Sequence, residues 1–435
     1  MTRTKQFFVT MILFLTLSAS SISALTLADI SSSFSDAFAS WVDKNEGNTS
    51  FRSLLVPFGG RTESLGSAYV GLGDDISYLQ SNPAAAAIQN ETQLSLFHNT
   101  WIADSKKETL AYTTRFDKIQ NLGVGGYVSC FYVPFTEYNI FGEKVASNYY
   151  LELVTGLNAA YNFFAGYNFK GLAVGATLKS GWRSIPNYTN NDTNEIIKGS
   201  GTDQSAYSIM LDVGFMMQFN FLKFFASQEP NVRIGFSAQN LGISVTGLAT
   251  HLKLDAGLPT LFTLGMSIRF LKPLTISFDF TQPFNFLAPT DYLKPYLHLG
   301  VGIRFTDFLE LLFGFQLKGA KPTLSTGLEF ELSKIRINVN YSLDFTSSLS
   351  PFNRFSLSTK IMLGDKGRKE RKDEVTEIYK AGLIYYQNAD WENAIATWQE
   401  ALKIDKHYDP AILGIKSAEY QIKMFDLIEK SLKLE

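Results

Sequence analysis

Ile335-Arg-Ile-Asn-Val-Asn-Tyr-Ser-Leu-Asp-Phe345 decides the fold, because apolar and polar residues alternate along this stretch without a break. Successive side chains of a β-strand point to opposite faces, so the stretch predicts a strand with one apolar and one polar face. Such a strand fits a barrel wall in a membrane, with lipid outside and a wet or plugged interior. A soluble sandwich would show similar alternation, so a single strand does not decide between the two.

The same pattern recurs along residues 91–363. It predicts fourteen strands, near 91–103, 106–116, 121–134, 148–164, 169–183, 206–220, 231–241, 259–270, 272–282, 294–305, 307–318, 322–333, 335–345 and 353–363. These segments are longer than the ~5–6 residues usual in globular proteins and long enough to cross a bilayer. An even number returns the chain to its starting side, as in bacterial barrels. The prediction is an all-β transmembrane barrel of fourteen antiparallel strands.

The predicted connections differ between the two ends of the barrel. Short connections are predicted at 118–120, 165–168, 271, 306 and 334, and long ones at 135–147, 184–205, 242–258 and 283–293. Short turns are typical of the periplasmic side of outer-membrane barrels and long loops of the outside. The connection 221–230 departs from this pattern, because it should be short. Either it forms a small interfacial helix or the predicted strand edges are displaced.

The chain before the barrel divides into two predicted parts. Residues 1–24 read as a signal peptide, with Arg3 and Lys5 before a short apolar run and small residues up to Ala24; an uncleaved anchor is the alternative. Residues 25–90 follow, with helical spacing over 30–42. A fourteen-stranded barrel is too wide for side chains alone to fill. Either something plugs the barrel or it is an open pore, and residues 25–90 are long enough to be the predicted hatch, or plug.

Charged residues inside the predicted strands share the polar face. They are Arg233, Asp279, Arg304, Glu329, Glu331, Arg336, Asp344 and Lys360. A charge on the lipid face would cost about 2–4 kcal/mol at the bilayer midplane. These residues are therefore predicted to be lumen-wall residues that pair with opposite charges.

Composition argues against several other functions. A net charge of −2 is unsuited to a nucleic-acid partner. The single cysteine, Cys130, is expected to be a packing residue, and the four histidines lack metal-ligand spacing. Phosphate-loop, dinucleotide and Gly-x-Ser-x-Gly motifs are missing. We therefore expect neither an enzyme nor a cofactor or metal, although a catalytic pair built across strands would not be visible in the sequence.

Beyond the barrel the periodicity becomes helical. Residues 364–374 are nearly all charged and are predicted to be a linker or the charged start of a helix. Residues 375–435 resemble one tetratricopeptide repeat on Ile378, Ala381-Gly382, Tyr385, Ala394, Trp398 and Ala401, with a further helix near 410–432. One repeat is too few for independent stability, so this tail should lean on the barrel, self-associate or bind a partner. Tyr385 and Trp398 are the predicted docking residues; an arbitrary helical hairpin is the alternative.

The front of the chain resembles the FadL family of outer-membrane channels for long-chain fatty acids. The resemblance covers about 50–363 and rests on Gly59-Gly60, Ala68, Gly71-Leu-Gly-Asp-Asp75, the Asn82-Pro83-Ala84 motif and the strands that follow. It is greatest for a spirochaetal (treponemal) branch with FadL-like barrels, some of which carry helical-repeat tails. The resemblance implies that Asn82, Pro83 and Ala84 belong to a hatch. It also implies a lateral opening in the third strand, here near Gly125 and Gly126, although ordinary barrel glycines are the alternative.

The resemblance implies an outer-membrane channel for passive uptake of long-chain fatty acids or similar hydrophobic small molecules. Outer-membrane lipid would surround the wall, and hatch and tail would both lie on the periplasmic side. An arginine of the lumen wall could hold a fatty-acid carboxylate, but nothing in the sequence selects one. The alternative is an outer-membrane assembly or secretion scaffold that docks a periplasmic protein through residues 375–435.

Overall fold

The computed structural model describes most of the chain after the first 42 residues. The described residues are 43, 45, 47–116, 121–139, 141–166, 169–188, 190, 193, 195–197, 200–225, 227, 229–248, 251–318, 321–345 and 352–432. The predicted signal peptide and the predicted helix at 30–42 lie outside the described residues.

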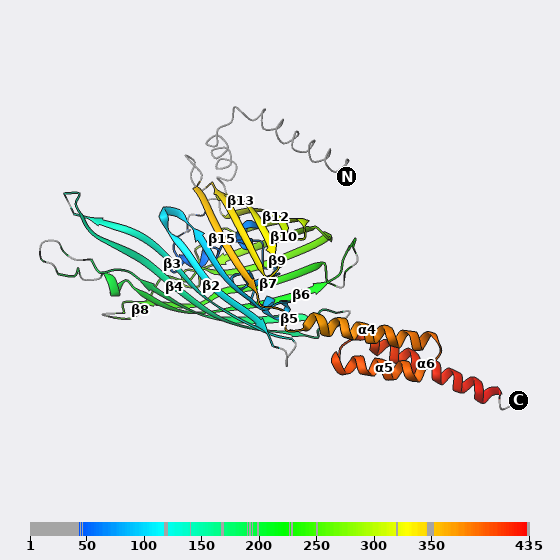
Figure 1. Ribbon diagram of the computed structural model, residues 1–435. Coiled ribbons are helices and arrows are strands. Elements are labelled where there is room, and N and C mark those ends of the chain that lie inside the picture. Colours follow the sequence, from blue (N-terminus) through cyan, green and yellow to red (C-terminus); the bar gives the residue numbers. More distant parts are fainter. Residues whose placement is uncertain are drawn as a thin grey trace, which may run out of the picture.

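Fourteen long antiparallel strands form a closed ring, shown in Figure 1. They are β1 Gln93–Thr100, β2 Lys106–Arg115, β3 Leu122–Tyr138, β4 Lys144–Phe163, β5 Leu172–Ser184, β6 Ala206–Phe219, β7 Val232–Thr246, β9 Thr260–Leu271, β10 Leu274–Phe284, β11 Tyr296–Thr306, β12 Leu309–Lys318, β13 Lys321–Leu332, β14 Ile335–Asp344 and β15 Phe352–Met362. The ring closes where β1 pairs with β15, placing Gln93 opposite Met362. One extra strand, β8 Lys253–Leu254, pairs with the end of β7. The predicted antiparallel barrel of fourteen strands is confirmed.

Side chains alternate between the inside and the outside of the wall. In β6, Asp212 and Gly214 are buried on the inner face, whereas Ile209, Leu211 and Phe215 are exposed on the outer face. Exposed apolar side chains recur on the outward positions of the other strands. A surface this apolar is suited to lipid contact, because water would have to be ordered around it.

Two predicted loops are wrong in part. The predicted loop 135–147 is mostly strand, because β3 and β4 continue as a paired hairpin in which Glu137 lies opposite Ala146. This hairpin projects beyond the neighbouring strands as a long arm in Figure 1. In the predicted loop 242–258, β7 continues to Thr246 and β8 pairs with it. The β3–β4 extension is less regular in polarity than the barrel wall. The β7 extension does alternate, but a register shift against β6 near Asn240, whose φ is 60°, separates it from the predicted strand.

The strands on either side of the connection 220–231 lie within one residue of their predicted ends there. Strand β6 ends at Phe219, and β7 begins at Val232. The described residues of this connection contain no helix, so the predicted interfacial helix is not found among them.

Residues 50–90, here called the inner segment, pack against the inward face of the wall. The segment contains four short helices: η2 Arg52–Leu55, α3 Arg61–Ser64, η3 Ile76–Gln80 and η4 Pro83–Ile88. Helix η4 contacts β3 to β6, whereas α3 contacts β12 to β14 on the other side of the ring. Tyr69, Ile76 and Tyr78 form its buried apolar core together with wall residues such as Phe97. One continuous segment therefore touches the wall around much of its circumference.

The tail consists of α4 Arg368–Gln387, α5 Trp391–Ile404 and α6 Asp409–Leu432, which extend away from one end of the barrel in Figure 1. The charged stretch 364–374 was predicted to be either a linker or the start of a helix. From Arg368 onward it is the start of α4. A third helix is found where one was predicted near 410–432. Among the described helices, none has the length and hydrophobicity that crossing a bilayer requires.

Candidate functional site

Asn82, Pro83 and Ala84 lie at the start of η4 and are buried. Asn82 Oδ1 accepts a hydrogen bond from the Ala84 backbone N–H at 3.1 Å and so caps the helix. Its Nδ2 donates to the carbonyl oxygens of Val70 at 2.9 Å and of Phe215 in β6 at 3.1 Å. Aspartate could not make these donations, and each buried carbonyl left without a donor would cost about 1–3 kcal/mol. The asparagine amide therefore links two parts of the inner segment to the wall.

Glycines in the wall let the inner segment approach very closely. A methyl group at Gly123 in β3 would lie 2.0 Å from the carbonyl oxygen of Ala86. On the other side of the ring, a methyl group at Gly314 in β12 would lie 2.0 Å from the backbone nitrogen of Gly66. Both distances are far shorter than any tolerated contact. The inner segment is thus fitted to this wall by backbone contact on opposite sides.

Arg61 lies at the centre of a buried ion-pair cluster between the inner segment and the wall. Its guanidinium lies 2.9 Å from the Asp74 carboxylate within the segment. It also lies 3.1 Å from Glu310 of β12 and 3.2 Å from Glu329 of β13. The Arg61 side chain is only 5% exposed, so water replaces few of these contacts. Arg61 therefore joins the segment to two wall strands at once.

Lys360 of β15 extends the ion-pair cluster. Its fully buried ammonium pairs with Asp75 of the inner segment and lies 3.4 Å from Glu329. The Tyr69 hydroxyl lies 2.6 Å from both the Asp74 and the Asp75 carboxylates. The cluster consists of Arg61, Tyr69, Asp74, Asp75, Glu310, Glu329 and Lys360. Each body contributes one cation and two carboxylates, and each cation pairs with a carboxylate of the other body.

Two further wall charges hold the inner segment. Asp279 of β10 accepts hydrogen bonds from the backbone N–H groups of Tyr69 and Val70, each at 2.7 Å. Arg354 of β15 lies 3.5 Å from the Glu63 carboxylate of α3. The predicted lumen-wall charges all occupy inward positions, and the predicted pairing is found for Arg304, Glu329, Glu331, Arg336, Asp344 and Lys360.

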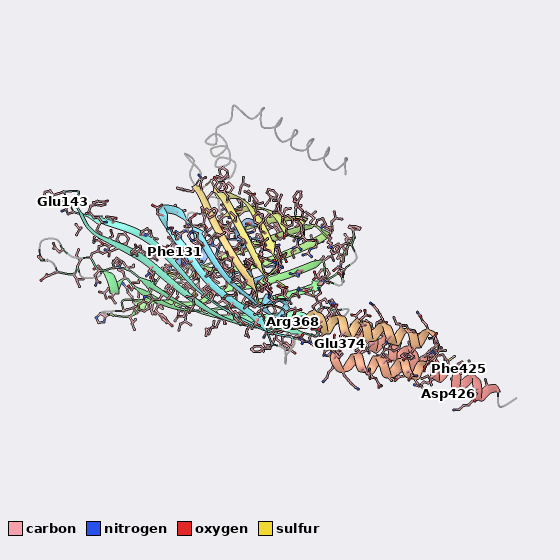
Figure 2. All side chains as sticks on the ribbon, in the orientation of Figure 1. Phe131, Glu143, Arg368, Glu374, Phe425 and Asp426 are labelled. Carbon is pink, nitrogen blue, oxygen red and sulfur yellow. The ribbon has the colours of Figure 1, made fainter. Side chains whose placement is uncertain are left out.

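A cavity of about 310 Å³, here called the loop-side cavity, lies where the inner segment begins. Its apolar lining comes from Leu55, Val56, Trp101, Ile102 and Phe131. Phe131 is labelled in Figure 2, on β3. The polar lining comes from the charged side chains Arg52, Glu152 and Lys318 and from Ser53 and Tyr150. Apolar walls with a few charged groups suit a ligand that has a hydrophobic body and a polar end.

Two cations of the wall contact residues that line the loop-side cavity. Lys107 Nζ donates to the backbone carbonyl oxygens of Ser53 at 2.9 Å and Val56 at 2.6 Å. The Arg354 guanidinium lies 4.0 Å from the ring centre of Trp101, within range of a cation–π contact. A second cavity of about 90 Å³ shares the lining residues Leu55 and Lys318. Leu55 of the inner segment therefore lines both of these cavities.

Gly125 and Gly126 lie within a continuously paired part of β3, with Gly125 opposite Thr113 of β2. Gly125 faces inward, and a methyl group there would lie 2.7 Å from the Tyr78 hydroxyl. Gly126 lies on the opposite face, where a methyl group would lie 3.1 Å from the Gly156 carbonyl oxygen. Close approach of the inner segment accounts for Gly125. The lateral opening stays a prediction, and Gly126 is the better position at which to test it.

Tyr385 and Trp398 lie in different environments. Trp398 is 1% exposed in the core of the tail, and its indole N–H donates to the Tyr379 carbonyl oxygen at 3.1 Å. Tyr385 is 42% exposed on α4. Docking through these residues remains a prediction, in which Trp398 would support the surface and Tyr385 would contact the partner.

Sequence reasoning missed the residues that tie the inner segment to the wall. Arg61, Asp74 and Asp75 stand in the glycine-rich stretch that carries the FadL resemblance, but their own charges were not singled out. Three charges in a segment expected inside a barrel were the available signal, because buried charges require partners. Their partners in β12, β13 and β15 are more than two hundred residues away, so no local spacing could identify them.

A closed ring of fourteen antiparallel strands that is apolar outside and polar inside, with its own inner segment packed against the wall, defines a β-barrel of the outer-membrane type. The chain belongs to the UPF0164 family: residues 26–366 match the model described as "Uncharacterised protein family (UPF0164)".

The chain is similar to known relatives and to solved structures. A UPF0164 protein of Treponema pallidum (strain Nichols) is 27% identical over 392 residues, which cover 88% of this chain and 86% of the relative. The structure titled "CymD monoaromatic hydrocarbon channel" aligns with a TM-score of 0.50 and 14% identity, covering 71% of this chain and 98% of that chain. A Pseudomonas aeruginosa FadL homologue aligns with a TM-score of 0.41 and 11% identity, over 70% of this chain and 98% of its own. The likeness to CymD shows the fold, and the treponemal branch of the predicted resemblance is confirmed by the family.

Proposed function

We propose that this protein is an outer-membrane channel for passive uptake of long-chain fatty acids or similar hydrophobic small molecules. The observation that carries the proposal is the loop-side cavity, whose apolar side chains lie beside Arg52, Lys318 and Glu152. The Glu152 carboxylate already accepts hydrogen bonds from the Ser53 backbone N–H and the Tyr150 hydroxyl. An aliphatic or aromatic body would contact Trp101 and Phe131, and a carboxylate would be attracted to the two cations. The name of the CymD channel, with a monoaromatic hydrocarbon as its cargo, supports a hydrophobic cargo here.

In this proposal residues 25–90 act as the hatch. The described part of that region contacts the wall on opposite sides through α3 and η4, and the buried ion-pair cluster anchors it. A hatch held in this way blocks free passage of hydrophilic solutes, so a cargo must bind before it passes. The motif Asn82-Pro83-Ala84 serves the hatch by fixing η4 to β6.

The proposed orientation places the turns at 272–273, 307–308 and 333–334 in the periplasm. Each of these turns joins two strands with only two intervening residues, which is typical of the periplasmic end. The chain leaves β15 at the same end, so the tail is periplasmic in this orientation.

Binding of a fluorescent long-chain fatty acid to delipidated protein tests the proposal. We expect saturable binding that survives deletion of 364–435. Phe131→Asp places a carboxylate in the loop-side cavity and should weaken binding at least about tenfold, equivalent to about 1.4 kcal/mol. Val128→Ala is the matched control, because Val128 lies on the outward face of the same strand and is 47% exposed.

Absence of saturable binding, or equal affinities for Phe131→Asp and Val128→Ala, would contradict the proposal. The assembly scaffold would then be favoured if the full-length protein retained a periplasmic partner that the deletion lost. A groove of about 390 Å³ in the tail, lined by Leu383, Tyr386 and Leu413, is the observation that supports this second function.

The proposed exit is lateral, through β3 near Gly126. Gly126→Val would strengthen the strand conformation there and fill the space toward Gly156, which should slow uptake of a hydrophobic probe into vesicles. Binding in detergent should be unchanged, because Gly126 lies outside the loop-side cavity. Uptake at the wild-type rate would remove the lateral opening from the account.

A further inference from the structure

A second cavity, of about 250 Å³, lies at the junction of the barrel and the tail. The barrel contributes the end of β2 and the connection between β4 and β5, and the tail contributes the start of α4 and the connection between α5 and α6. Figure 2 labels Arg368 at this junction. The two bodies touch beside the cavity, since a methyl group at Gly166 would lie 3.5 Å from the Asp409 carboxylate. We call this space the junction cavity.

The junction cavity is lined by five cationic side chains and one carboxylate. Arg115 and Lys170 come from the barrel, Arg368, Arg371 and Lys372 come from the tail, and Asp405 is the carboxylate. Like charges from two bodies repel one another across such a space, more strongly where water is partly excluded. The lining therefore favours a ligand with negative charge.

Hydrogen bonds to the end of the inner segment hold two of these cations in place. Arg115 Nη1 donates to the Gln89 carbonyl oxygen at 3.3 Å, and Arg368 Nη2 donates to the Asn90 carbonyl oxygen at 2.7 Å. Burial, together with the nearby Lys372 ammonium, lowers the pKa of Lys170 below its ordinary value, although the Asp409 and Asp405 carboxylates act in the opposite direction.

The start of α4 is not the binding feature. The Asp365 carboxylate already accepts hydrogen bonds from the backbone N–H groups of Gly367 at 3.0 Å and Lys369 at 2.8 Å. Side-chain cations, and not the helix N-terminus, therefore supply the attraction for an anion.

Apolar groups in and around the junction cavity indicate an amphiphilic ligand. Phe116, Val375 and Ile404 share the lining with the cations. Phe164 and Phe169, in the adjoining connection, are 82% and 45% exposed. Exposed aromatic side chains at a barrel rim are typical of the membrane–water interface, where lipid phosphates lie.

We propose that the junction cavity binds the phosphate group of an anionic phospholipid of the surrounding leaflet. The phosphate lies between the cations of the barrel rim and those of α4, and the acyl chains follow the apolar outer wall past Phe116. By neutralising repulsion between the two bodies, the lipid holds the tail against the barrel. This inference is independent of the proposed transport function, because the junction cavity and the loop-side cavity share no lining residue.

Calorimetric titration of the delipidated full-length protein with short-chain phosphatidylglycerol tests the proposal. We expect saturable binding, and a loss of affinity of at least about tenfold in the double variant Arg371→Gln/Lys372→Gln. The matched control is Lys369→Gln/Lys380→Gln, which removes the same charge from α4 at positions outside the lining. All these positions lie in the tail, so heat-modifiable gel migration should report an intact barrel in every variant.

Two further arms identify the source of the phosphate. Short-chain phosphatidylcholine should bind more weakly than phosphatidylglycerol, because its head group has no net charge. Inorganic phosphate that bound as tightly as phosphatidylglycerol would overturn the lipid assignment, and equal affinities of the two double variants would overturn the site. Fatty-acid binding should be unchanged in both double variants, so failure here is distinguishable from failure of the transport proposal.

Discussion

Replacing Arg61 with methionine is expected to free the hatch and open the barrel to hydrophilic solutes. The change removes the one cation that Asp74, Glu310 and Glu329 share, and it leaves their carboxylates buried without it. Removing one partner from a buried ion pair costs about 3–5 kcal/mol. The strand ladder does not involve the Arg61 side chain, so the loss should fall on the attachment of the inner segment and not on the ring.

Swelling of proteoliposomes in a sugar solution measures this opening. Arg61→Met should admit the sugar, whereas Arg304→Met is the matched control. Arg304 lies 3.4 Å from the same Glu310 carboxylate, but its side chain is 49% exposed, and exposed pairs contribute only about 0–1 kcal/mol. Heat-modifiable migration should show a folded ring in both variants. If Arg61→Met excluded the sugar as well as the wild type does, the ion-pair cluster would not be what anchors the hatch.

Replacing Trp398 with alanine is expected to unfold the tail while the barrel stays folded. The indole ring fills the space between α4 and α6, where a methyl group at Gly382 would lie 2.3 Å from its Nε1 and one at Gly414 2.9 Å from its Cε3. Large-to-small changes of a buried aromatic side chain cost about 3–5 kcal/mol. A helical unit this small has little stability to lose, so most of its helix should disappear.

Urea titration, followed by the helical circular dichroism signal, measures the stability of the tail. Heat-modifiable migration on a gel shows whether the barrel is folded. Tyr385→Ala is the matched control, because its side chain is 42% exposed and its loss should change stability by no more than about 0.5 kcal/mol. Similar urea midpoints for the two variants would contradict the packing described for Trp398. The two variants also separate folding from docking. If a partner binds through Tyr385, Tyr385→Ala should lose the partner and keep its helix.

The barrel could be predicted from the sequence because a period of two is a local property. Ile335 to Phe345 shows it within one strand, and the repetition of such strands gave the number and direction of the wall segments. The hairpin of β3 and β4 was shortened in the prediction, because the alternation fades where the strands project beyond the barrel wall. Local pattern therefore identified the strands better than their ends.

The candidate sites could be predicted only in part. The resemblance brought Asn82 to attention, and the structure explains its amide by two donated hydrogen bonds. The contacts of Arg61 and Lys360 join positions far apart in the chain, and the junction cavity combines β2 with α4. Such sites depend on the closed ring and the position of the tail. A charged stretch at 364–374 signals solvent exposure on its own, and only the fold brings Arg115 beside it.

Uptake by vesicles that contain the wild-type protein tests the central claim most directly. The same vesicles are given a fluorescent long-chain fatty acid and, separately, a small sugar. A hatch anchored inside a closed ring predicts that the fatty acid enters faster than in protein-free vesicles while the sugar stays outside. Free passage of the sugar without accelerated entry of the fatty acid would contradict the account, because it would show an open hydrophilic pore.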